Sequence, residues 1–240
     1  MSVLKRLVAA APLALISLNA NADITDKFTT VWATTLSTNY VERAESKNQN
    51  DPALGAAFVI LSDNTNFYGT VLGHNTAQTD VNGATATLEL KPGLGFYYNW
   101  DEYNTDIDVQ LRYYFYPGYK GLDYPELMVN LKNWIFRGEV GFSNDVFDSG
   151  TDGHYLQAGL DIPLEMAHPA LDTFFFDGFW GHYHLGAAAG DSYDYYKLAV
   201  RKEHNTYEIG YEYWNMDNNS SLKALNRYGH HSIFYVTKYF

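Results

Sequence analysis

Apolar and polar residues alternate with a period of two along much of this chain. The clearest stretch is 102–116. Its apolar positions are Tyr103, Ile107, Val109, Leu111, Tyr113 and Phe115, and its polar positions are Glu102, Asn104, Asp106, Asp108, Gln110 and Arg112. Successive side chains of a β-strand point to opposite faces, so this stretch is predicted to be a strand with one apolar face and one polar face.

The same alternation recurs along the rest of the chain, in 85–96, 134–142, 155–162, 196–201 and 206–213. Three further stretches, 28–38, 52–61 and 174–187, are expected strands that fit either parity. Long polar connections are expected at 39–51, 75–83, 117–123, 143–153, 190–193 and 215–227. Tight turns are expected at 62–66, 99–101, 132–133 and 203–205, and a longer connection with a helical turn at 163–173. Short and long connections therefore alternate.

Strands of about ten residues, joined alternately by short turns and long loops, are typical of outer-membrane barrels. We therefore predict an all-β fold, an antiparallel transmembrane up-and-down β-barrel of about 12 strands with short periplasmic turns and longer extracellular loops. The alternative is a secreted β-sandwich, whose apolar face would be a shared core. The 21 Tyr, 14 Phe and 5 Trp favour the barrel, because they gather near the strand ends, where interfacial girdles form.

The N-terminal segment has the features of an export signal. Lys5 and Arg6 precede an apolar stretch at 7–18, and Ala20-Asn21-Ala22 is a small-x-small cleavage site. We predict a secretory signal peptide at 1–22, cleavage between Ala22 and Asp23, and a barrel domain at 23–240. No later apolar stretch reaches the roughly 18 to 20 residues that a membrane helix needs, which disfavours a helical membrane protein.

The composition limits the classes of partner and cofactor that the chain can bind. With 28 Asp and Glu against 16 Lys and Arg, the formal charge is −12, and the loss of Lys5 and Arg6 would make it −14. A chain this acidic is a poor partner for nucleic acid. There is no Cys, so disulfides and thiolate metal sites are excluded. No phosphate-binding or dinucleotide motif is present, and no cofactor is expected.

The polar positions of the predicted strands would face the barrel interior. The predicted pore-lining residues are Glu89, Lys91, Asp106, Asp108, Arg112, Glu126, Arg137, Glu139, Lys197, Arg201, Glu208 and Glu212. Two interpretations stay open: rows of opposite charge that create a transverse field across a narrow pore, or inward salt bridges that plug it. If the pore is open, the acidic excess predicts a weak preference for cations, reduced by salt.

Other chemistry is weakly supported. His182 and His184 share one face of a strand, but no carboxylate lies at a convincing ligand spacing, so no metal site is expected. Ser143 follows Gly141-Phe142 without the second Gly of a nucleophile elbow, so no catalytic residue is assigned. Asp145, Asp148 and Asp152 fit a solvated loop, or a site for divalent cations that bridge lipopolysaccharide phosphates.

Several segments together resemble the TorF-type family of porins, exported outer-membrane proteins of unknown substrate. The residues that carry the resemblance are Asp51-Pro52-Ala53-Leu54, Phe67-Tyr68-Gly69-Thr70, Glu89 with Pro92-Gly93-Leu94-Gly95, Tyr113-Tyr114-Phe115-Tyr116-Pro117-Gly118, Asp123-Tyr124 with Glu126, and Tyr155-Leu156. The resemblance implies an outer-membrane barrel and a pore. Where the family tends to have Tyr-x-x-Arg-Gly-x-Ser, this chain has Ala44 in place of the Gly.

The first functional hypothesis is therefore a passive diffusion channel for small hydrophilic solutes in the outer membrane of a Gram-negative bacterium. The alternatives are a closed barrel that serves as an envelope scaffold or adhesion surface through its loops, and, third, an outer-membrane enzyme. The expected partners are outer-membrane lipid and lipopolysaccharide, the solutes, and the barrel-assembly machinery, which would read the terminal Phe240.

Overall fold

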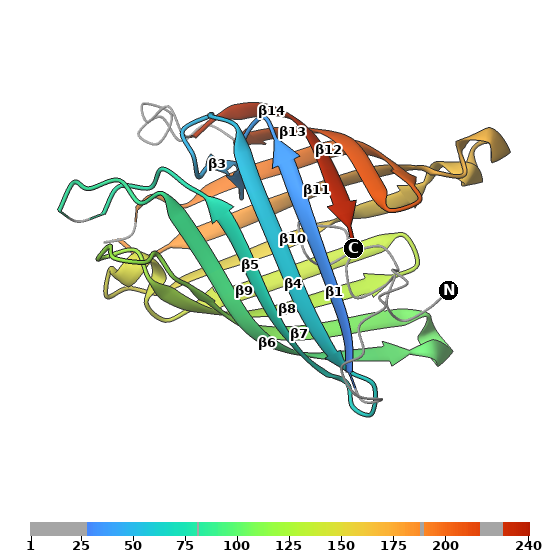
Figure 1. The fold of residues 1–240 in the computed structure, drawn as a ribbon, viewed down its shortest axis with the longest axis horizontal. Helices are drawn as coiled ribbons and strands as arrows, with labels where there is room; N and C mark the ends of the chain where they lie inside the picture. The colour runs from blue at the N-terminus through green and yellow to red at the C-terminus, as the bar shows by residue number, and fades with distance from the viewer. Residues whose placement is uncertain (1–27, 81, 188–189, 217–227) are drawn as a thin grey trace.

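The computed structural model describes residues 28–80, 82–187, 190–216 and 228–240, which form a closed antiparallel β-barrel (Figure 1). The barrel strands are β1 (Phe28–Ser37), β4 (Ala53–Ser62), β5 (Phe67–Asn75), β6 (Leu88–Trp100), β7 (Thr105–Tyr114), β8 (Tyr124–Asn133), β9 (Phe136–Ser143), β10 (Gly153–Pro163), β11 (Phe174–Leu185), β12 (Tyr193–His204), β13 (Tyr207–Met216) and β14 (His230–Tyr239). The predicted fold class and the expected strand number are confirmed.

The barrel closes because the first strand pairs with both the second and the last barrel strand. Phe28 of β1 lies opposite Ser62 of β4, and Ala33 of β1 lies opposite Tyr239 of β14. The remaining strands each pair with their sequence neighbours. A closed barrel leaves no unpaired strand edge, so the backbone polar groups of the wall are satisfied within the sheet.

The barrel has an apolar outside and a polar inside. In β6, Glu89 and Lys91 are buried, whereas Leu94 is 72% exposed on the outer surface. Closure also decides the parities that the sequence left open: in β1, Trp32 and Leu36 face outward, while Val31 and Ala33 are buried. A soluble protein would hide such an outer band, and a barrel in lipid exposes it.

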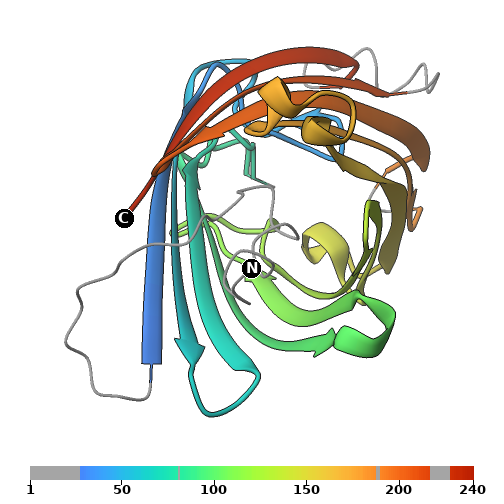
Figure 2. The ribbon, with the colours of Figure 1, turned by 90° about the vertical axis from the view of Figure 1, so that its right-hand side faces the viewer.

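Connections of different length gather at the two ends of the barrel. One end carries the short turns after β4, β6, β8 and β12 and the longer connection 163–173 after β10, and Figure 2 faces this end. The turn after β8 lies at Trp134-Ile135, not at Lys132-Asn133 as the sequence predicted, because Trp134 adopts the positive φ of 54° that the turn requires. We call this the short-turn end and the other the loop end.

Short 3₁₀ turns complete the described secondary structure: η1 (Asp101–Tyr103), η2 (Val146–Asp148), η3 (Leu164–Met166) and η4 (Pro169–Leu171). Two of them, η3 and η4, occupy the connection 163–173, where a helical turn was expected. No helix within these described residues is long and apolar enough to cross a membrane. The predicted signal peptide and its cleavage site at Ala22 and Asp23 lie outside the described residues.

The connection 39–51 differs most from its expectation as an outer loop. It forms a small hairpin of β2 (Val41–Glu42) and β3 (Glu45–Ser46) that folds into the barrel. Arg43 and Ala44 make the turn with φ values of 50° and 61°, as a two-residue hairpin with two positive φ angles requires. Residues 40–48 contact inward side chains of β5, β6, β7, β8, β10 and β12. We call residues 39–51 the lumenal hairpin.

Candidate functional site

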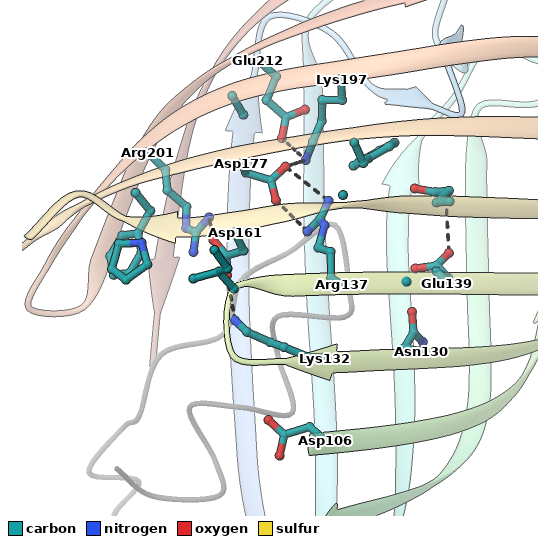
Figure 3. Close-up of a pocket in the computed structure, with 18 of the residues that line it drawn as sticks. Asp106, Asn130, Lys132, Arg137, Glu139, Asp161, Asp177, Lys197, Arg201 and Glu212 are labelled. Atoms are coloured by element: carbon teal, nitrogen blue, oxygen red, sulfur yellow. Dashed lines mark hydrogen bonds and ion pairs between the residues drawn. The ribbon is translucent and has the colours of Figure 1, made fainter. Parts of the chain in front are cut away.

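A cavity of about 710 Å³ occupies the half of the barrel next to the short turns. Its lining includes Asn104, Trp134 and Asn205 at the short turns, and Val41 to Arg43 of the lumenal hairpin at its inner end. We call it the vestibule. Figure 3 shows its charged side chains reaching inward from successive strands. It is the candidate site because it combines enclosed volume with convergent charged groups.

Asp161 of β10 is the first centre of charge in the vestibule. One carboxylate oxygen lies 2.7 Å from Nζ of Lys132, and the other lies 3.0 Å from the Arg201 guanidinium (Figure 3). Arg201 also lies 3.5 Å from Glu203 and 3.9 Å from Glu208. The cations of this group are thus shared among several carboxylates.

Asp177 of β11 is the second centre. It lies 2.7 Å from the Arg137 guanidinium and 2.9 Å from Nζ of Lys197 (Figure 3). Lys197 also reaches Glu212 at 3.4 Å. The ring of Phe179 lies beneath both cations, 4.9 Å from Arg137 and 5.2 Å from Lys197. Together, the two centres form a zigzag of alternating charge from β8 to β13.

Other carboxylates of the vestibule receive hydrogen bonds from neutral donors. The Tyr68 hydroxyl donates to Asp108 at 2.6 Å, and the Tyr155 hydroxyl donates to Glu139 at 2.6 Å. The Tyr97 hydroxyl donates to Asp106 at 2.7 Å. Arg112, which also lines the cavity, donates through its Nε to Gln110 at 3.0 Å.

The loop end of the lumen is packed around Arg43, at the tip of the lumenal hairpin. Its guanidinium donates to Glu126 at 2.5 Å and lies 3.9 Å above the centre of the Tyr155 ring. Its carbonyl oxygen accepts a hydrogen bond from the Tyr193 hydroxyl at 3.0 Å. These partners come from β8, β10 and β12, so the tip spans the lumen.

A second ionic cluster holds the base of the hairpin against β6. Nζ of Lys91 lies 2.8 Å from Glu42 and 3.2 Å from Glu89. The Tyr40 hydroxyl donates to Glu89 at 3.0 Å, and the Tyr116 hydroxyl also donates to Glu89. Burial alone would raise the pKa of Glu42, but Lys91, Arg43 and Lys47 hold that pKa well below its ordinary value.

The structure divides the predicted pore-lining residues between these two regions. Nine of them line the vestibule: Asp106, Asp108, Arg112, Arg137, Glu139, Lys197, Arg201, Glu208 and Glu212. The other three, Glu89, Lys91 and Glu126, are at most 2% exposed and contact the hairpin. Whether any of them lines an open pore stays a prediction.

Sequence reasoning missed the two residues around which the vestibule charges are organised. Asp161 occupied a polar position of its strand and could have been found by parity. Asp177 lies in the stretch whose parity was ambiguous, and Lys132 was assigned to a turn. The charges of the lumenal hairpin were also missed, because nothing local marks an inserted loop.

Of the remaining candidates, the two histidines lie outside the lumen. His182 and His184 are on the outer surface, where His182 contacts Asp194 at 2.6 Å and His184 contacts Ser192 at 3.1 Å. Among the residues that the structure describes, no group of three His, Asp or Glu could hold a metal ion. Asp145 accepts a hydrogen bond from the backbone N–H of Gly150 at 2.7 Å, within its own loop.

Solved structures with the same architecture exist, although sequence comparisons find nothing. No protein family and no curated protein matches the chain, so the resemblance to the TorF-type family is not confirmed. The KdgM porin superposes with a TM-score of 0.53 at 7% identity, covering 88% of this chain and 99% of that chain. The KdgM porin in complex with disordered oligogalacturonate superposes with a TM-score of 0.52 at 8% identity, covering 88% and 98%.

The COG4313 outer membrane channel from Pseudomonas putida F1 has a TM-score of 0.48 at 8% identity, covering 94% of this chain and 100% of that chain. At these identities, the likeness to the KdgM porin shows a shared fold. These structural neighbours are outer-membrane porins and channels.

Proposed function

We propose that the protein is an outer-membrane channel for the passive diffusion of small hydrophilic solutes. The observation that carries the proposal is the charged vestibule, about 710 Å³ in volume, inside a closed barrel whose outer surface is apolar. A polar, hydrated interior is what a hydrophilic solute requires to cross a lipid layer. The shared fold with the KdgM porin is consistent with this proposal.

The proposed location is the outer membrane of a Gram-negative bacterium. The apolar outer band supports it, and so does the signal-like segment 1–22. In this orientation the short turns face the periplasm and the vestibule opens toward that side. Lipid and lipopolysaccharide would contact the outer band. The assembly machinery would read Phe240, whose ring packs 5.7 Å from that of Trp32 on the outer surface.

The lumenal hairpin makes this a channel that must open. In the structure described here, residues 40–48 pack across the loop end of the lumen, and Ala44 and Ser46 are at most 1% exposed. A solute that leaves the vestibule toward the loop end would meet the Arg43 tip. We therefore propose that conduction requires this hairpin to move aside.

The second candidate is a closed barrel that acts as an envelope scaffold or adhesion surface. The ionic anchoring of the hairpin favours it, because a permanently plugged barrel would show the same contacts. The outer loops would then do the work.

Single-channel recording separates the two candidates. The refolded mature protein would be compared, in planar bilayers, with a variant whose residues 41–46 are replaced by a Gly-Ser segment of equal length. A matched control replaces residues 63–66, in the exposed short turn after β4, in the same way. A channel predicts discrete steps that become larger or more frequent in the hairpin variant alone. Silence of all three folded, inserted proteins would favour the scaffold.

A further inference from the structure

We propose that the vestibule selects small organic cations, such as primary amines, over anions of the same size. This inference rests on the proposed function, because it names the solute class that the cavity of that channel admits. It goes beyond the acidic net charge of the chain, since it depends on which charges line the cavity and which of them are already neutralised.

The lining of the vestibule is acidic. It contains eleven Asp and Glu residues against six Lys and Arg residues. An enclosed site with low-dielectric walls concentrates the field of its lining charges, and mobile counter-ions follow that field. Entry into the vestibule therefore lowers the free energy of a cation more than that of an anion.

Five of the six cations of the lining are engaged with wall carboxylates. Lys132 and Arg201 lie within 3.0 Å of Asp161, and Arg137 and Lys197 lie within 2.9 Å of Asp177. Arg43 is held by Glu126 at 2.5 Å. The sixth, Arg112, donates through its Nε to the neutral Gln110. An entering carboxylate would have to compete with these wall carboxylates for the first five of these cationic groups.

Several carboxylates of the lining have no such engagement. Within the described ranges, no Lys or Arg nitrogen lies within 4.0 Å of Asp108, Glu139, Glu165 or Asp172. Glu165 and Asp172 belong to the short-turn end, and Asp108 and Glu139 lie deeper. Asp108 and Glu139 accept hydrogen bonds from tyrosine hydroxyls, which orient the carboxylates but bring no positive charge to them. A cation would relieve their charge along the whole cavity.

The other walls suit the carbon skeleton of an organic cation. Leu131, Ile135, Phe175 and Phe179 line the same cavity. Aromatic faces here already carry cations, as Phe175 lies 4.5 Å from the Arg201 guanidinium. The cavity volume of about 710 Å³ is within the range of small-molecule sites.

Three four-carbon probes with different end groups test the inference by titration calorimetry on the refolded protein in detergent: putrescine, butane-1,4-diol and succinate. We expect putrescine alone to bind. The double substitution Asp108→Asn with Glu139→Gln should weaken its binding by about ten-fold, as expected for a desolvated charge contact. The control is Glu102→Gln, which removes the same kind of charge from the exposed turn η1. It should leave binding unchanged.

Binding of succinate as strong as that of putrescine would overturn the proposal, and so would equal weakening by the Glu102 control. The comparison among probes uses the wild-type protein, so it holds even if the double variant misfolds. Absence of binding by all three also contradicts the inference. The channel is tested separately by conductance: putrescine binding to a barrel that never conducts would leave the cavity chemistry standing and refute the channel.

Discussion

The two halves of the lumen contain similar side chains but use them differently. At the loop end, Arg43 and Glu126 form an ion pair whose side chains are only 6% and 2% exposed. In the vestibule, Lys132 and Arg137 are 30% and 24% exposed while paired with Asp161 and Asp177. The first half excludes solvent around its charges, and the second leaves its cations partly hydrated.

This difference indicates which half of the lumen should be rigid and through which half a solute should pass readily. Dehydrated charges are stable only with a complete set of partners, so the removal of one partner is costly. Partly hydrated charges tolerate change, and a passing solute can exchange with water around them. Substitutions at the loop end should therefore change how often the channel opens. Substitutions in the vestibule should change which ions pass.

The largest effect is expected from Arg43→Ala. It leaves Glu126 as a buried carboxylate without its guanidinium, which should destabilise the closed hairpin by about 3–5 kcal/mol. Single-channel recording should then show a large rise in open time. Arg43→Lys keeps a positive charge but loses the planar guanidinium. Its open time should therefore lie between those of the wild-type protein and Arg43→Ala. Addition of Glu126→Gln to Arg43→Ala should recover part of the lost stability. Unchanged gating in Arg43→Ala would show that this ion pair does not hold the hairpin closed.

Low pH should also release the lumenal hairpin. Because the pKa of Glu42 is lowered below its ordinary value of 4.5 when the hairpin is folded, its stabilisation is complete above that value. The stabilisation is lost as pH falls through the lowered pKa. Open probability measured against pH should rise in this acidic range. Glu42→Gln should weaken closure at neutral pH and make the acid response shallower; an identical response in both proteins would contradict the assignment.

A smaller stabilising effect is expected from Ala44→Gly. Ala44 has a φ of 61°, a left-handed conformation that costs a residue with a Cβ about 1 kcal/mol relative to glycine. The substitution should lengthen closed times by about five-fold, because 1 kcal/mol corresponds to that ratio. Ala53→Gly is the control, since Ala53 lies in a strand and should only lose stability. Shorter closed times in Ala44→Gly would show that backbone strain does not limit closure.

The smallest effect is expected in the vestibule. Asp177→Asn removes one lining carboxylate and leaves Arg137 and Lys197 less compensated. The reversal potential in a salt gradient should move toward anion permeation, with roughly a two-fold change in permeability ratio at low salt. Asp152→Asn removes a charge that lies 57% exposed in an outer loop and should change nothing. Equal shifts in both variants would place selectivity outside the vestibule.

The alternation of apolar and polar residues predicts most of the barrel strands and the face on which each side chain lies. In 102–116 the polar parity, including Asp106, Asp108 and Arg112, is the buried parity of β7, and the apolar parity faces outward. Such a pattern is local, because each side chain reports the face on which it lies. Where the pattern was mixed, as in 174–187, the inward position of Asp177 could not be assigned, and one centre of the vestibule was missed.

The lumenal hairpin is the clearest case of information that was not local. Residues 39–51 are polar and rich in charge, which is what a solvated loop also requires. Their burial depends on partners far along the chain, such as Glu126 for Arg43 and Lys91 for Glu42. Only the closed barrel brings these strands around one point.

About a dozen two-faced strands with long and short connections follow from the local pattern alone, because the period of two acts within each strand. Closure of the barrel sets which end of the lumen is packed and which contains the vestibule, and which carboxylates keep a cation. These outcomes depend on which strands face one another across the closed barrel. Strand closure therefore set the candidate function of each charge, whereas the local pattern set only its face.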